Sequence, residues 1–236
     1  MHFGALRIRA ASSILALASC ASLSSQQPDP ASVIQHVDAN NRARYDHVLG
    51  FTDIEHYAVF RGNDQTHPAA EMTVKTTYKK GVGKTYTVLS QSGSGLIQRL
   101  GLRPLLENEK AINDPATVQK SWFVSVNYQM QLKPGLTRVI DGRTCIALSI
   151  VPRHKASNMI DGTLWIDAEN YENVEVEGVA SRSPSIFAGT TRMMRSYANI
   201  SGYAMATRAR AESNSFLFGR TVVTIDYTAY QIQLAQ

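Results

Sequence analysis

Residues 70–80 read AEMTVKTTYKK, and this stretch decides the fold class. From Met72 on, large side chains stand at every second position, with charged or hydroxyl side chains between them. Successive side chains of a β-strand point to opposite faces of the sheet, so this alternation predicts an antiparallel strand with one solvated face. Residues 57–62 precede it, and residues 86–91 follow it after a Gly-Val-Gly turn at 81–83. We therefore expect a three-stranded meander.

Further strand-like segments fill most of the remaining chain. They are separated by turn residues and cover residues 123–132, 136–140, 144–151, 162–167, 174–180, 190–200, 203–212 and 220–233. Together with the first meander they make about ten antiparallel strands. A sheet of that size has to curl, close or split.

Two segments have helical patterns instead. The apolar side chains of residues 31–49 fall near one face of a helix, and Gly50 ends the segment. Residues 95–113 are leucine-rich, and we expect one or two short helices there, broken near Pro104. So few helices beside one long meander indicate a mainly β (α+β) fold. We predict a single curled antiparallel sheet that forms an unclosed half-barrel, with the N-terminal helix and short lid helices in its concavity. A closed barrel with the helices outside is the alternative.

The N-terminus has the pattern of an exported protein. Residues 1–19 read as a signal peptide, in which Arg7 and Arg9 precede an uncharged run that is too short to span a bilayer. The stretch Leu17-Ala18-Ser19-Cys20 has the shape of a lipobox. We therefore expect lipidation of Cys20, with an ordinary cleaved signal as the alternative.

The segment after Cys20 predicts a tether. Residues 20–30 are rich in Ser, Gln and Pro, which favours a flexible chain, and residues 31–236 suit one domain. We expect a lipid-anchored protein that faces the periplasm, and the outer membrane is the favoured location. A soluble periplasmic or secreted protein is the alternative.

The charge balance argues against nucleic acid as a partner. The chain has 24 Lys and Arg against 19 Asp and Glu, a formal charge of +5. Without the two arginines of residues 1–19, 22 basic residues face 19 acidic ones, which leaves +3. No basic block stands out. Cys145 lies among β-branched and aliphatic residues, which favours a buried structural thiol.

Residues that could carry chemistry form no recognisable catalytic or metal site. Residues 81–85 end like a phosphate-binding loop, but a strand-like segment follows them where that motif needs a helix. The histidines show no metal-ligand spacing. Asp53, Glu55 and His56 lie at a strand start, where we expect solvated charges. Because no nucleophile, base and orienting group come together, we expect a non-enzymatic protein without metal or cofactor.

The second half of the chain resembles the outer-membrane lipoprotein carrier and receptor superfamily, the LolA/LolB-like proteins. The segments that carry the resemblance are DGRTCIALSIVP at 141–152, GTLWID at 162–167, YAMATR at 203–208, and FGR at 218–220 leading into TIDYTAYQI at 224–232. The resemblance implies an unclosed barrel whose concave face, covered by short helices, holds acyl chains or other apolar ligands. It carries over no individual ligand-contacting residue.

In such a barrel the apolar face of each strand would line the cavity. The candidates on the strands are Met72, Val74, Leu148, Ile150, Leu164, Ile166, Val223 and Ile225, and those on the lid are Leu96, Ile97 and Leu100. The same side chains would also fill an ordinary β core. We therefore expect a non-enzymatic envelope lipoprotein that binds lipid or lipoprotein acyl chains, in lipoprotein sorting or lipid transport. The alternative is a periplasm-facing sensor that binds another envelope protein on the same scaffold.

Overall fold

A computed structural model describes residues 28–182, 190–215 and 219–235. Its ten strands are β1 (Val48–Arg61), β2 (Ala70–Lys79), β3 (Gly83–Gly93), β4 (Tyr128–Ile140), β5 (Arg143–Pro152), β6 (Ile160–Asp167), β7 (Asn173–Ala180), β8 (Thr191–Ile200), β9 (Tyr203–Ser215) and β10 (Gly219–Leu234). The helical elements are α1 (Pro30–His47), α2 (Gly95–Ile97), η1 (Gln98–Leu102), α3 (Arg103–Ile112) and η2 (Val118–Ser121). Among the described residues, no helix is long and apolar enough to cross a membrane.

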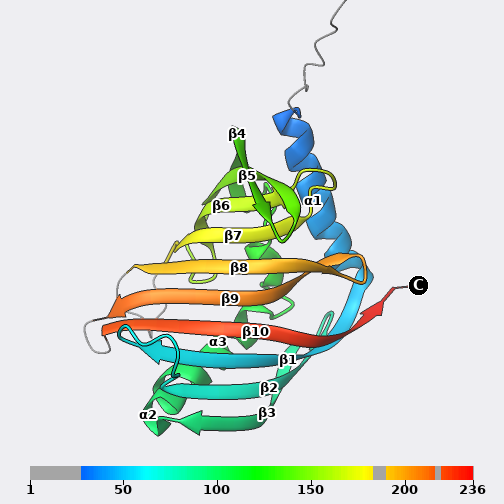
Figure 1. Ribbon diagram of the computed structural model, residues 1–236. Helices are drawn as coiled ribbons and strands as arrows, with labels where there is room; N and C mark the ends of the chain where they lie inside the picture. Colours follow the sequence, from blue (N-terminus) through cyan, green and yellow to red (C-terminus); the bar gives the residue numbers. More distant parts are fainter. Residues whose placement is uncertain (1–27, 183–189, 216–218, 236) are drawn as a thin grey trace, which may run out of the picture.

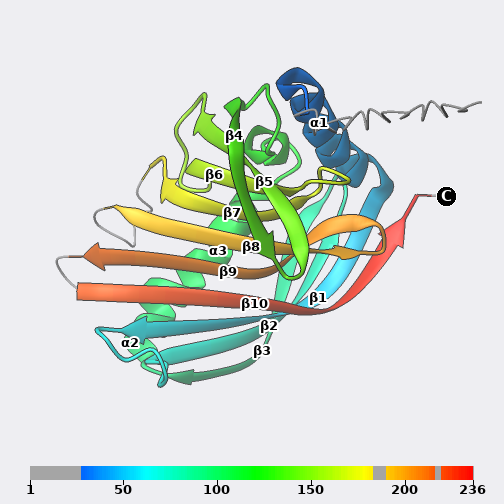
Figure 2. The same cartoon turned by 45° about the horizontal axis from the view of Figure 1, so that its top comes forward.

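All ten strands form one antiparallel sheet. Its order is β3-β2-β1-β10-β9-β8-β7-β6-β5-β4, so β1 pairs with β10 and every other neighbour follows directly in the chain. The strands β3 and β4 are the two edges and do not pair with each other. The sheet curls without closing (Figures 1 and 2). This confirms the unclosed half-barrel, and the alternative of a closed barrel is wrong.

The N-terminal helix α1 packs on one end of the concave face. Asp29 caps it by accepting a hydrogen bond from the Ser32 N–H at 2.9 Å, and Pro30 occupies its first turn. Its Val33 and Val37 are buried against β4–β8. The helix ends at His47, two residues before the predicted end, and passes directly into β1.

The lid is the continuous segment α2–η1–α3, which lies in the concavity behind the sheet in the view of Figure 1. The predicted break near Pro104 takes the form of a wide π-helical turn over Gln98–Leu102. Proline cannot donate a backbone hydrogen bond and clashes with the carbonyl four residues earlier, and the wider turn relieves this conflict.

Two strand predictions were wrong in detail, for different reasons. Residues 128–132 and 136–140, which come from two predicted segments, lie in one strand, β4, with a register shift between Leu132 and Thr137, whereas residues 123–127 form bends and turns. Pro134 is tolerated there because β4 is an edge strand and has no partner on one side. β1 begins nine residues before the predicted start at 57. The pattern missed this part of the strand because two of its inward positions carry acidic side chains.

Two hydrophobic clusters fill the ends of the concavity. The cluster beneath α1, named here the helix-side core, includes Leu148, Ile150, Leu164 and Ile166. The cluster beneath the lid, the lid-side core, includes Met72, Val74, Val223 and Ile225. Cys145 is fully buried in a third, small cluster with Trp165, on the opposite face of the sheet. The prediction of a buried structural thiol is confirmed.

Candidate functional site

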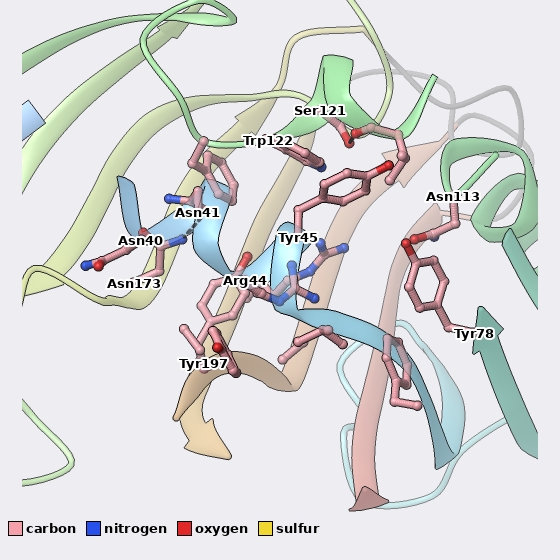
Figure 3. A pocket seen from close by; sticks show the side chains of 18 of the residues that line it. Asn40, Asn41, Arg44, Tyr45, Tyr78, Asn113, Ser121, Trp122, Asn173 and Tyr197 are labelled. Carbon is pink, nitrogen blue, oxygen red and sulfur yellow. Dashed lines mark hydrogen bonds between the residues drawn. The ribbon is translucent and has the colours of Figure 1, made fainter. Parts of the chain in front are cut away.

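A pocket of about 280 Å³ lies in the concavity, bordered by α1, α3, η2 and the strands β8–β10 (Figure 3). Its wall is rich in aromatic side chains: Tyr45, Phe51, Tyr78, Trp122, Phe123, Tyr197, Tyr203, Tyr227 and Tyr230. The charged side chains of the wall are Arg44, Lys84, Glu109, Glu172 and Arg195. The pocket therefore suits a ligand with an apolar body and a polar or charged group.

Tyr45 and Trp122 pack against each other in the pocket wall on the α1 side. Their ring centroids are 4.3 Å apart, and the Lys80 ammonium lies 4.4 Å from the Tyr45 centroid. On the β1 side, the Phe51 ring lies 5.1 Å from Tyr78 and 5.7 Å from Tyr230. These rings come from α1, η2, β1, β2 and β10, so only the folded sheet brings them together.

Two arginines face the pocket from opposite sides. Arg44 extends from α1 (Figure 3), and its Nε donates to the Met205 sulfur at 3.4 Å. Arg195 extends from β8 and lies close to the Tyr197 side chain. Over the described residues, neither guanidinium has a carboxylate within 4.0 Å.

The polar groups at the α1 end of the pocket are amides. The Asn173 side chain donates to the side-chain Oδ1 of Asn41 at 3.0 Å (Figure 3), and the Asn40 side chain donates to the backbone carbonyl of Asn170 at 2.9 Å. The Glu172 carboxylate accepts from the Asn199 amide at 2.9 and 3.0 Å. The first two bonds hold the middle of α1 to the β6–β7 turn and the start of β7, and the bonds of Glu172 hold that turn to β8.

A buried ion pair lies below the β1 side of the pocket. The Lys84 ammonium is 3.0 Å from one Glu55 carboxylate oxygen, and the Tyr57 hydroxyl donates to the other. Glu55 is fully buried and Lys84 is 8% exposed. Burial, followed by the Glu55 carboxylate, raises the pKa of Tyr57 well above its ordinary value of 10.0, so this hydroxyl stays a donor. Both carboxylate oxygens of Glu55 thus have a hydrogen-bond partner.

Asp53 lies next to this pair and is only 2% exposed. Its pKa is raised from 3.8 to about 7, mainly by burial and to a smaller extent by the Glu55 carboxylate, while the Lys84 ammonium opposes the shift. The Thr76 and Tyr230 hydroxyls lie close to it. However, neither Asp53 oxygen has a well-formed hydrogen bond among the described residues, and the Tyr230 hydroxyl donates to the Ala206 carbonyl at 2.8 Å instead. Asp53 is thus a buried carboxyl group that stays mainly protonated below about pH 7.

The expectation of solvated charges at positions 53–56 was therefore wrong for two of the three residues. Asp53 and Glu55 point into the concavity, and only His56 faces outward, where it contacts Thr73 at 3.1 Å and Glu71 at 3.3 Å. Alternation alone could have revealed this, because positions 53 and 55 share a strand face with Tyr57.

The structure distributes the predicted cavity-lining residues over both cores. Leu148, Ile150, Leu164 and Ile166 lie in the helix-side core, and Met72, Val74, Val223, Ile225 and Ile97 lie in or against the lid-side core. Leu96 and Leu100 are 50% and 48% exposed on the outer side of the lid. None of the eleven lines the pocket. Their contact with a ligand stays a prediction.

The remaining expectations concern the N-terminus and metal binding. Cys20, the signal peptide and most of the tether lie outside the described residues. Within the described ranges, no group of three or more His, Cys, Asp or Glu side chains could hold a metal ion. The residues that sequence reasoning missed are the pocket arginines and tyrosines, which are scattered along the chain without a common motif.

No protein-family model matches the chain, and no curated protein matches its sequence. Among solved structures, it is similar to a LolA superfamily protein from Nitrosomonas europaea, with 12% identity over 89% of this chain and 96% of the other and a TM-score of 0.46. It is also similar to a DUF1329 family protein from Desulfovibrio piger, with 11% identity, coverage of 89% and 95%, and a TM-score of 0.44.

A third similar structure is an outer membrane lipoprotein-sorting protein domain from Vibrio parahaemolyticus, with 13% identity, coverage of 86% and 92%, and a TM-score of 0.46. These likenesses concern the course of the chain alone. A LolA superfamily protein is thus among the solved structures to which this chain is similar, as the sequence resemblance predicts.

Proposed function

We propose that this protein is a non-enzymatic envelope lipoprotein that binds an acyl chain, or another apolar or amphipathic ligand, inside its half-barrel. The observation that carries the proposal is the aromatic pocket between α1, α3 and the concave face. Its volume of about 280 Å³ is at the lower end of ligand pockets, which suits part of a lipid better than the whole molecule.

Movement of the lid would extend the binding space. The lid is held to the sheet by Leu102 and Leu106, both buried, and by two hydrogen bonds of 2.7 Å from Gln98 to the backbone carbonyls of Glu71 and Ser92. If the lid swings away, an acyl chain can replace its leucines on the lid-side core. Each buried CH₂ would contribute about 0.8 kcal/mol, which compensates the lost lid contacts. The predicted strand residues would contact ligand in this open state.

The two tryptophans provide a direct test of ligand binding. Trp122 lines the pocket, whereas Trp165 lies on the opposite face of the sheet, stacked on Arg138 at 4.2 Å and hydrogen-bonded to Glu177 at 2.8 Å. A brominated fatty acid should quench the fluorescence of a Trp165→Phe variant, which retains Trp122. The matched Trp122→Phe variant, which retains Trp165, should show little quenching.

Mass spectrometry of the purified protein completes this test. We expect acyl lipids to co-purify and to be displaced by the brominated probe. A folded protein that neither retains acyl lipids nor shows Trp122 quenching would contradict the proposal. The protein-interaction alternative would then be preferred.

The anchor and the location are part of the same proposal and need their own test. We propose that Cys20 is acylated and holds the domain at the periplasmic face of a membrane, through the tether at 20–30. Labelling with radioactive palmitate should mark the protein and spare a Cys20→Ala variant. Equal labelling of both proteins would refute the anchor without affecting the binding proposal.

A further inference from the structure

We propose that Arg44 and Arg195 bind the anionic headgroup of the ligand, a carboxylate or a phosphate, inside the pocket. This inference rests on the proposed function, since it specifies the ligand of the same pocket. It predicts that the protein prefers acidic amphiphiles over neutral ones with the same acyl chain.

The first argument is the lack of acidic partners. Arg44 and Arg195 are both only partly exposed, and neither has a carboxylate within 4.0 Å over the described residues. By contrast, three partly buried arginines of this sheet do have one: Arg138 pairs with Glu175, and both Arg210 and Arg220 pair with Glu212, at 3.3 and 2.8 Å. Removing a guanidinium from water without a counter-ion is costly, so an anion entering the pocket would be stabilised there.

The second argument is the number of free donors. A guanidinium has five N–H donors in a planar fork that matches the oxygens of a carboxylate or phosphate. Within the described residues Arg44 has one hydrogen bond, to the Met205 sulfur, which is a weak acceptor, and Arg195 lies close to the Tyr197 hydroxyl. The remaining donors of both side chains are available for a bidentate contact.

The third argument is position. Arg44 belongs to α1 and Arg195 to β8, so an anion between them would bridge the helix and the sheet. In Figure 3 the Arg44 side chain lies between the rings of Tyr45 and Tyr197. Aromatic walls exclude water, and the lower effective dielectric strengthens the attraction between the arginines and an oxyanion.

The other charges of the pocket do not cancel this preference. Lys84 is neutralised by Glu55 at 3.0 Å, and Glu172 is engaged by Asn199. Glu109 faces Arg195 from the lid, at more than 4.0 Å, and partly offsets its charge. Because Glu109 is on α3, an opening lid would carry it away from Arg195 and leave both arginines to the headgroup.

The test compares ligands that share one chain and differ in the headgroup: palmitate, hexadecyl phosphate and hexadecanol. Binding is measured at pH 8 by displacement of a fluorescent fatty acid. We expect the two anions to bind at least about tenfold more tightly than the alcohol. Arg44→Gln and Arg195→Gln should each reduce the affinity for the anions about tenfold and leave hexadecanol binding unchanged.

Arg42 supplies the matched control, because it lies on the same helix with a side chain that is 60% exposed. An Arg42→Gln variant should keep the full preference for anions. The headgroup comparison in the unmodified protein decides the question even if an arginine variant fails to fold.

The possible outcomes separate this inference from the proposed function. Equal affinity for all three ligands would overturn the anion site and leave the proposed function intact. No binding of any of them would overturn the proposed function as well. If acetate or inorganic phosphate alone bound as tightly as the amphiphiles, the pocket would be a site for free anions, and the assignment to a headgroup would be wrong.

Discussion

Replacing Asp53 by asparagine should make the protein more stable, and the gain should grow with pH. The Asp53 carboxyl is 2% exposed, and burial with the neighbouring Glu55 raises its pKa from 3.8 to about 7. Between these two pH values the folded protein holds a proton that the unfolded chain has released. The free energy of unfolding therefore falls as the pH rises through this window.

The magnitude follows from the two pKa values. A tenfold change in proton affinity corresponds to about 1.4 kcal/mol, so the raised pKa of folded Asp53 lowers the free energy of unfolding by about 4 kcal/mol at pH 8 and about 1.5 kcal/mol at pH 5, compared with a carboxyl whose pKa stays at 3.8. Asparagine keeps a similar shape and carries no charge. The stability gained by Asp53→Asn should thus be about 2–3 kcal/mol larger at pH 8 than at pH 5.

Urea unfolding at pH 5, 6, 7 and 8, followed by tryptophan fluorescence, measures this difference. An Asp161→Asn variant serves as control, because Asp161 is an exposed carboxylate on β6. Its effect should be the same at each pH. A stability difference for Asp53→Asn that does not change between pH 5 and pH 8 would refute the idea that Asp53 is buried in its neutral form.

Two further substitutions test the packing around the pocket. Lys84→Met leaves the Glu55 carboxylate buried without a counter-ion and should lower the free energy of unfolding in urea by about 3–5 kcal/mol. Adding Glu55→Leu should restore most of this loss. If the effects of the two substitutions simply add in the double variant, the proposed coupling is contradicted. Gly162→Ala would place its Cβ 2.1 Å from the Glu177 carbonyl oxygen and should cost about 1–3 kcal/mol or more. In the control Gly101→Ala, the added Cβ has only an ordinary van der Waals contact, and stability should change by less than about 1 kcal/mol. Equal effects of the two glycine variants would contradict this prediction.

Much of the fold could be predicted from local patterns. The alternation in residues 70–80 was sufficient for β2, and ten strands with few helices led to the open half-barrel. The prediction failed where an inward position carries a polar side chain. Asp53 and Glu55 interrupt the apolar alternation of β1, so nine of its 14 residues were missed. Pro134 similarly divided β4 in the prediction, since its edge position is not visible in the sequence.

The site was less predictable than the fold. The apolar candidates were correctly placed on inward faces, but they fill the two cores of the present structure. Arg44 and Arg195 gave no signal, because neither belongs to a spacing pattern and each on its own reads as a surface arginine.

The sequence by itself thus determined most of the strands and helices, and the inward face of those strands that have an alternating apolar pattern, since a period of two or of 3.6 residues is a local property of the chain. Only the tertiary structure decided which inward side chains meet. Pairing of β1 with β10 and the docking of α1 and the lid bring Arg44, Arg195 and the tyrosines around one pocket. These elements are far apart in the chain, and their contacts depend on the curl of the whole sheet, which no local period encodes.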